Sequence, residues 1–138
     1  MHNLIRLLTT IGSVITIGFG AWHFFVPGIW NWYSYIDANA PELVIAIRAI
    51  NAFFSLSLVL FGTINILIIY LNYSNRISVI IVLLSSIVLW ITRVSFQIIY
   101  PQGSMNSMIQ YGMLISFLLV AFFYIISLFL FVFDKNIA

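Results

Sequence analysis

Four long apolar segments, separated by short polar connections, divide the chain. The segments cover residues 4–26, 43–71, 77–100 and 107–133, and each reaches the length of about 20 mostly apolar residues that a helix needs to cross a bilayer. The connections contain Pro, Gly, Asn or Ser, which commonly end helices. No segment alternates with the period of two that a membrane β-barrel requires. The pattern predicts an all-α integral membrane protein, a four-transmembrane-helix bundle forming one domain over residues 1–138.

Small or polar residues recur every three or four positions within these segments, which places them on one face of each helix. In a bilayer, helices associate through small residues and hydrogen bonds, because hiding apolar surface from lipid gains little. We therefore expect these faces to point into the bundle, and the Phe and Leu residues of the fourth segment to face lipid. The predicted inward faces are Gly12, Thr16, Gly20 and His23; Arg48, Asn51, Ser55, Leu58, Gly62 and Asn65; Ser86, Trp90, Arg93, Gln97 and Tyr100; and Gly112, Ser116 and Ser127.

The composition agrees with a membrane protein and excludes several other classes. Of the 138 residues, 64% are hydrophobic and 6% are charged, and the mean hydropathy is +1.18, whereas a soluble domain carries about 25% charged residues. A soluble domain and a disordered chain are therefore excluded, and five Lys and Arg residues are too few for a nucleic-acid-binding surface. With no cysteine, two histidines and three carboxylates, we expect no disulfide, metal site or other cofactor.

The positive charges indicate the orientation of the chain in the membrane. Arg6 begins the first helix, Arg76 lies in the second connection and Lys135 follows the fourth helix. An even number of spans brings all three to the same side, while Asp37 and Glu42 lie in the first connection. Because Lys and Arg are enriched on the cytoplasmic side, we expect both termini in the cytoplasm and the first connection outside.

Two arginines lie inside the predicted spans, in the half of the bundle nearer the first connection. Arg48 is about six residues into the second helix and Arg93 about seven residues before Tyr100, so both lie roughly 9–10 Å below the outer surface. His23, about one turn from the end of the first helix, lies at a similar level. A charged side chain at this depth normally faces the bundle or a wet cavity and has a partner.

These groups suggest a binding site. Guanidinium groups bind phosphate and carboxylate through paired hydrogen bonds. We therefore predict a non-enzymatic membrane protein that binds an anionic or polar, lipid-like ligand in the outer half of the bundle. A lipid headgroup, a polyprenyl phosphate or a quinone carbonyl would each fit. The candidate ligand-binding residues are Arg48, Arg93, His23, Asn51, Trp90, Gln97 and Glu42.

Other interpretations of the same residues are open. The arginines can be structural, with Arg48 reaching Glu42 or lipid headgroups, and Arg93 bonding Gln97 and backbone carbonyls. They can also meet carboxylates of another membrane subunit, and the chain can form homo-oligomers. The alternative function is a small membrane enzyme or a quinone-linked redox accessory subunit, with His23 as its acid–base group. His2 and His23 lie at opposite membrane faces, so they do not share a haem iron.

Two short stretches resemble bacterial membrane proteins. The HF-x-x-P segment that closes the first helix of DoxX-like proteins, a four-helix family, is similar to Gly20-Ala21-Trp22-His23-Phe24-Phe25-Val26-Pro27. A W-x-x-R-x-x-x-Q pattern of other four-helix proteins, whose activity is unassigned, resembles residues 90–97. The resemblance implies a four-helix fold in the bacterial cytoplasmic (inner) membrane and, from DoxX-like relatives, a quinone-linked or redox role. The chain departs from the DoxX-like pattern early in the second helix, where Arg48 and Asn51 replace an acidic residue.

Overall fold

The computed structural model describes residues 2–37, 39–71, 75–103 and 106–134. Its elements are α1 (His2–His23), α2 (Val26–Ile29), the 3-10 helix η1 (Trp32–Tyr35), α3 (Pro41–Tyr70), α4 (Arg76–Ile99) and α5 (Ser107–Phe133). Over these ranges, α1, α3, α4 and α5 are long and apolar enough to cross a membrane, which confirms the predicted all-α, four-helix membrane fold. The largest difference in boundaries is at the end of α1, which the sequence places at residue 26 and the structure at His23.

Local sequence explains where three of the long helices begin. Asn75 caps α4 and Asn106 caps α5, because their side-chain oxygens accept hydrogen bonds from the backbone N–H groups of Ser78 and Met108. Pro41 is the first residue of α3, a position where its missing N–H removes no bond within the helix. The caps fix where each helix starts, and so place the connections at the two ends of the bundle.

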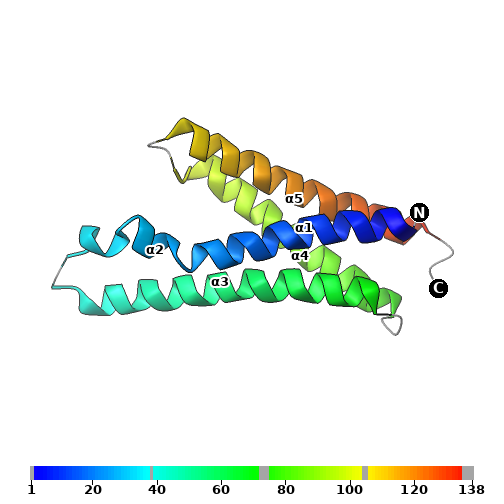
Figure 1. Cartoon of the computed structure of the whole chain (residues 1–138), viewed down its shortest axis with the longest axis horizontal. Helices are drawn as coiled ribbons and strands as arrows, with labels where there is room; N and C mark the ends of the chain where they lie inside the picture. Colours follow the sequence, from blue (N-terminus) through cyan, green and yellow to red (C-terminus); the bar gives the residue numbers. More distant parts are fainter. Residues whose placement is uncertain (1, 38, 72–74, 104–105, 135–138) are drawn as a thin grey trace.

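The two ends of the bundle differ in the segments that they bring together. The N-terminus of α1 and the C-terminus of α5 lie at one end, here named the N-terminal end, with the C-terminus of α3 and the N-terminus of α4 (Figure 1). The opposite end, named the α2 end, holds α2, η1 and the other helix termini. Helix α1 packs extensively against α3 and α5, and α4 against α5, whereas α3 and α4 share a small contact. The α4–α5 pair therefore diverges from the α1–α3 pair toward the α2 end (Figure 1).

Helices α1 and α3 approach each other closely at two glycines. A Cβ atom added to Gly20 would lie 2.8 Å from the Ser55 carbonyl oxygen and 2.9 Å from Leu58 Cβ, and one added to Gly62 would lie 2.6 Å from Ile17 Cγ1. No side chain fits at either position without moving a helix. This close backbone contact is the packing that small residues provide between membrane helices.

Side-chain hydrogen bonds join α1, α4 and α5 near the middle of the bundle. The Tyr124 hydroxyl lies 3.2 Å from Ser13 Oγ and 3.3 Å from Thr16 Oγ1, and the Trp90 indole N–H donates to Thr16 Oγ1 over 3.1 Å. Thr16 donates its own proton to the Gly12 carbonyl. Because a threonine has one hydroxyl proton, Tyr124 donates to Thr16 and accepts from Ser13. The three helices are thus joined by a hydrogen-bond network in which the donor and the acceptor of each bond are determined.

The predicted inward faces of α1 and α3 are confirmed apart from one residue at the α2 end. The positions predicted to face inward are buried in the middle of both helices: Gly12, Thr16 and Gly20 in α1, and Asn51, Ser55, Leu58, Gly62 and Asn65 in α3. His23 is half-buried, and Arg48 is exposed. Since Arg48 lies in the second turn of a helix whose neighbours diverge at this end, its side chain reaches the surface of the bundle.

The predicted faces of α4 and α5 are partly wrong. Tyr100 is 69% exposed, and Gly112 is also exposed, with open space where a side chain would begin. Phe117 and Phe131, expected to face lipid with the other Phe residues, are buried. Phe117 turns inward because its ring packs against that of Phe19, with 5.0 Å between ring centroids, in the space between the diverging helix pairs. Ser127 is buried as predicted, so the inward face of α5 combines small and aromatic residues.

Candidate functional site

His23 and Asn51 form a reciprocal pair that joins the end of α1 to α3 at the α2 end. His23 Nδ1 lies 2.8 Å from Asn51 Oδ1, and Asn51 Nδ2 donates to the His23 backbone carbonyl over 3.0 Å. The imidazole also packs edge-on against Phe54 and Trp32, with ring centroids 4.9 and 6.3 Å away. The orientation of the ring is therefore fixed by three side chains from α3 and η1. The structure brings together two of the predicted site residues.

Arg93 is a half-buried cation that faces the interior from α4. Its Nη2 donates to Gln102 Oε1 over 2.6 Å, and its Cζ atom lies 4.4 Å from the centroid of the Phe117 ring. It forms no ion pair with any residue that the structure describes. The Phe117 ring packs in turn against Phe19, with ring centroids 5.0 Å apart, and Phe19 lies one turn before His23 on α1. The site therefore has a positive charge, held between an amide and an aromatic ring, without a balancing anion in the described chain.

Arg48 lies at the surface of the same end and has a different surrounding. Its Cζ atom lies 4.7 Å from the centroid of the Tyr33 ring in η1, a distance at which a cation interacts with the π face. Glu42, in the first turn of α3, is exposed and forms no ion pair with Arg48 among the described residues. The first turn is a favourable place for a carboxylate because of the helix dipole. Arg48 thus adds a second positive charge near the site, at its exposed rim.

Trp90 and Gln97 support the site and do not line it, which corrects the prediction made for them. They are 1% and 2% exposed, so neither presents a surface to a ligand. The Trp90 N–H donates to Thr16. The Gln97 amide N–H donates to the backbone carbonyl of Gln102 over 2.9 Å, and its oxygen accepts from the Gln102 N–H over 3.4 Å. Gln97 therefore holds in place the residue that bonds Arg93.

Sequence reasoning missed two contacts of Arg93. It considered Gln97 as the partner, whereas the structure places Gln102 there. Gln102 lies after the end of α4, so helix periodicity gives no information about its direction. Phe117 was assigned to the lipid face with the other rings of its segment. The signal for Phe117 was the unpartnered arginine itself, because a half-buried guanidinium commonly stacks on a ring.

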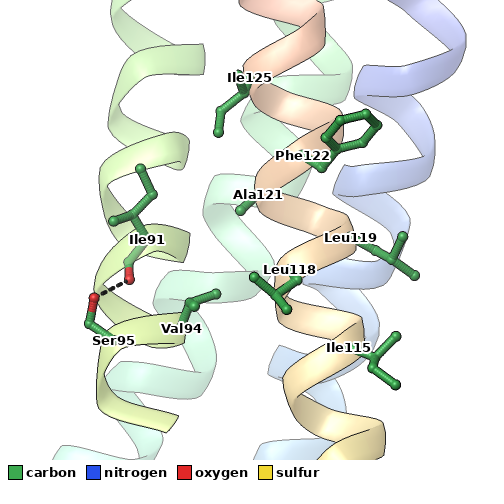
Figure 2. A pocket seen from close by; sticks show the side chains of 9 residues that line it. All are labelled: Ile91, Val94, Ser95, Ile115, Leu118, Leu119, Ala121, Phe122 and Ile125. Carbon is green, nitrogen blue, oxygen red and sulfur yellow. Dashed lines mark hydrogen bonds between the residues drawn. The ribbon is translucent and has the colours of Figure 1, made fainter. Parts of the chain in front are cut away.

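An apolar groove of about 530 Å³ lies elsewhere, between α4 and α5. Figure 2 shows that its lining side chains come from these two helices. Its one polar lining residue is Ser95, whose hydroxyl donates to the Ile91 carbonyl. The groove offers no charged group to recognise a headgroup, and it lies on the surface expected to face lipid. It is therefore separate from the site around Arg93.

The comparisons with known proteins leave function to be argued from the site alone. No protein-family model, curated protein or solved structure matches the chain. The DoxX-like resemblance and the quinone-linked role that it implies therefore stay predictions. Within the described ranges, no three His, Cys, Asp or Glu side chains gather as metal ligands would. The functional groups of the site are an arginine, a histidine and the amides that hold them.

Proposed function

We propose that the chain is a small multi-pass protein of the bacterial cytoplasmic membrane that binds an anionic, lipid-like ligand at its α2 end and catalyses no reaction. Arg93 binds the anionic group, His23 supplies a second polar contact, and Arg48 attracts the ligand at the rim. Asn51 holds His23, and Gln102 holds Arg93. The bilayer supplies the apolar surroundings for the rest of the ligand.

The observation that carries the proposal is the half-buried charge of Arg93. A charged side chain costs up to about 2.5–3.5 kcal/mol on insertion scales, the value for the centre of a membrane span, and it normally faces the bundle interior and a polar partner. The contacts to Gln102 and Phe117 are neutral and satisfy one of its N–H groups by a hydrogen bond. A guanidinium has five N–H groups. A phosphate or carboxylate oxygen would complete its hydrogen bonding and balance its charge.

The test of the proposal is native mass spectrometry of the gently solubilised protein, with R93Q and R93K beside it. We expect a bound anionic lipid in the wild type, its loss in R93Q, and its partial return in R93K because the charge is restored. The matched control is S95A on the lipid-facing groove of the same helix, which should keep the ligand. An empty wild-type protein, or a second protein subunit that R93Q releases, would overturn the lipid-like ligand.

We also propose that the α2 end lies outside the cytoplasm. Arg6 and Arg76 lie at the N-terminal end, and Asp37 and Glu42 lie at the α2 end, in line with the enrichment of basic residues on the cytoplasmic side. Lys135, which contributes to this argument from the sequence, lies outside the described residues.

The absence of cysteine from the sequence makes the orientation simple to test, since single cysteines can be introduced without prior substitutions. Tyr35 is 84% exposed at the α2 end, and His2 is exposed at the N-terminal end. We expect a membrane-impermeant maleimide to label Y35C on intact cells, and H2C only after the cells are permeabilised. The reverse pattern would place the α2 end in the cytoplasm and contradict the proposed orientation.

A second candidate function is favoured by the position of His23. Its Nε2 atom forms no hydrogen bond to a described residue, which suits an acid–base group in a small membrane enzyme or a quinone-linked accessory subunit. In that case H23N should abolish turnover of a quinol in reconstituted membranes while the ligand stays bound. If the protein only binds its ligand, no turnover depends on His23.

A further inference from the structure

The hydrogen bonds of Asn51 determine which of its two amide atoms faces His23. A backbone carbonyl only accepts hydrogen bonds, so the Asn51 atom 3.0 Å from the His23 carbonyl oxygen is the NH2 group. The other amide atom, the oxygen Oδ1, therefore faces the imidazole, at 2.8 Å from Nδ1. The alternative rotation of the amide would place two oxygens against each other, and two N–H groups against the ring.

The orientation of Asn51 in turn determines where the imidazole carries its proton. Because Oδ1 only accepts, Nδ1 must donate, and so Nδ1 is protonated. In a neutral imidazole the proton is on one nitrogen only, and the other has a lone pair that accepts hydrogen bonds. Nε2 is therefore the acceptor. The contacts with Phe54 and Trp32 keep the ring from turning and exchanging the two nitrogens.

Nε2 is accessible and lies in the same site as the unpaired charge. It has no hydrogen-bond partner among the described residues, and it is absent from the set of fully buried polar atoms without partners. Arg93 stacks on Phe117, and the Phe117 ring packs against Phe19, one turn before His23 on α1. A ligand in this site meets a positively charged hydrogen-bond donor, Arg93, and a neutral acceptor, Nε2. Arg93 binds an acceptor of the ligand, whereas Nε2 binds a donor.

From this arrangement we infer that the ligand carries a hydroxyl group beside its anionic oxygen, as a polyol-phosphate headgroup does. The inference rests on the proposed function, because it assigns the chemical class of the ligand at the same site. The anionic oxygen accepts from the Arg93 guanidinium, and the neighbouring hydroxyl donates to His23 Nε2. Asn51 is a positioning residue that acts through His23. An anion without a hydroxyl would leave Nε2 without a donor and bind more weakly.

The tautomer can be measured without any ligand. In an H2A background, His23 is the only histidine left in the sequence, so ¹⁵N labelling of histidine gives the signals of its two ring nitrogens alone. We expect one protonated nitrogen, Nδ1, and one unprotonated nitrogen, Nε2, at pH 7.5. In N51L the ring loses its acceptor, and we expect the two neutral tautomers to mix. A protonated Nε2 in the H2A protein, which keeps Asn51, would overturn the inference.

The ligand class is tested with two lipids that carry the same phosphodiester charge. Phosphatidylglycerol has hydroxyl groups in its headgroup, and phosphatidylethanol has none. We expect the wild type in nanodiscs to bind phosphatidylglycerol about three- to tenfold more tightly, the effect of one hydrogen bond. H23N, whose shorter amide lacks an atom at the Nε2 position, should lose this preference and keep its affinity for phosphatidylethanol. N51L should reduce the preference in the same direction.

The two proposals fail in different ways in this experiment. R93Q should weaken the binding of both lipids equally and keep the ratio of their affinities. Unchanged binding in R93Q would overturn the proposed function. Equal binding of the two lipids by the wild type, with R93Q still weakening both, would overturn only the inference about the hydroxyl. Deacylated glycerophosphoglycerol identifies the source of the headgroup. Competition by it at concentrations similar to those of the lipid indicates a soluble polyol phosphate, and failure to compete indicates a lipid.

Discussion

Arg76 and Arg93 lie near the two ends of α4 and have different surroundings. At the N-terminal end, Arg76 donates to the backbone carbonyls of Val132 and Asp134 over 2.6 and 3.2 Å. Its Cζ atom also lies 5.7 Å from the centroid of the Phe131 ring. At the α2 end, Arg93 donates to one neutral side chain, that of Gln102, and stacks on Phe117. The two arginines of α4 therefore differ in their acceptors, which are backbone carbonyls for Arg76 and one side-chain amide for Arg93.

The difference follows from what each end of a helix leaves unsatisfied. The last carbonyl groups of a helix have no partner within it and carry the negative end of the helix dipole. Arg76 bonds carbonyls at the end of α5 and so completes the fold. At the α2 end, the start of α5 offers N–H groups rather than carbonyls and is already capped by Asn106. Arg93 therefore bonds no helix carbonyl of α5 and keeps N–H groups for a ligand, which favours a role in binding.

The largest effect is expected for R93Q on ligand binding. Removing the charge should weaken the binding of an anionic lipid by about 2 kcal/mol, or roughly thirtyfold in affinity. Truncation of one partner in a close charge pair typically has an effect of this size. Titration of nanodiscs with labelled phosphatidylglycerol measures it. Thermal stability without ligand should stay close to that of the wild type. A large loss of stability with unchanged affinity would make Arg93 a structural residue like Arg76.

R76M should show the opposite pattern, with an effect of similar or slightly smaller size. Methionine keeps the apolar stem of the side chain but leaves the carbonyls of Val132 and Asp134 without these donors. Hydrogen bonds from charged groups contribute about 1.5–3 kcal/mol, so we expect the free energy of unfolding to fall by about 2 kcal/mol in detergent denaturation. R93M is the matched variant. Equal destabilisation of R93M and R76M would contradict the different roles assigned to the two arginines.

Y124F tests the region between the two ends. The substitution removes a hydroxyl that bonds Ser13 and Thr16 in the middle of the bundle. Hydrogen bonds between membrane helices contribute about 0.6 kcal/mol each on average, so the free energy of unfolding should fall by about 1 kcal/mol, with ligand affinity unchanged. Y111F, at a tyrosine that is 59% exposed, is the control and should have no effect. A loss of ligand affinity in Y124F would extend the site into the core.

The smallest effect is expected for R48Q. Because Arg48 is exposed, its attraction for an anionic ligand is screened by salt beyond about 10 Å at 0.1 M ionic strength. We expect the association rate to fall roughly twofold at low salt and the difference to disappear at high salt, with the dissociation rate unchanged. Stopped-flow measurements at two salt concentrations test this. A salt-independent loss of affinity would show that Arg48 contacts the ligand directly.

The sequence predicts the helices and the placement of one half of the candidate site. The lengths of the apolar segments and the residues that interrupt them determine where the helices lie. His23 and Asn51 fall on the inward faces that spacing predicts, and the structure joins them. In these two helices the face is marked by small and polar residues, because α1 and α3 approach through Gly20 and Gly62. Where backbones touch, periodicity and packing give the same answer.

The other half of the site depends on packing that periodicity does not contain. Trp90 and Gln97 are on the predicted face of α4, but a face does not distinguish residues that line a site from those buried beneath it. Helix α5 is so apolar that few small residues mark its inward face: Ser127 is buried as predicted, whereas Gly112 is exposed. Gln102 reaches Arg93 only because the chain turns after α4. Its place follows from tertiary structure alone.

All four arginines of the chain lie against an aromatic ring of another element: Tyr70, Tyr33, Phe131 and Phe117 in turn. For Arg48 and Arg93 the ring replaces the carboxylate that usually faces a cation within the protein. Carboxylates take up protons near pH 4 and lose their charge, whereas the π face of a ring is unaffected by acid. The two cations of the α2 end thus keep these contacts under acidification, because neither depends on a group that takes up a proton.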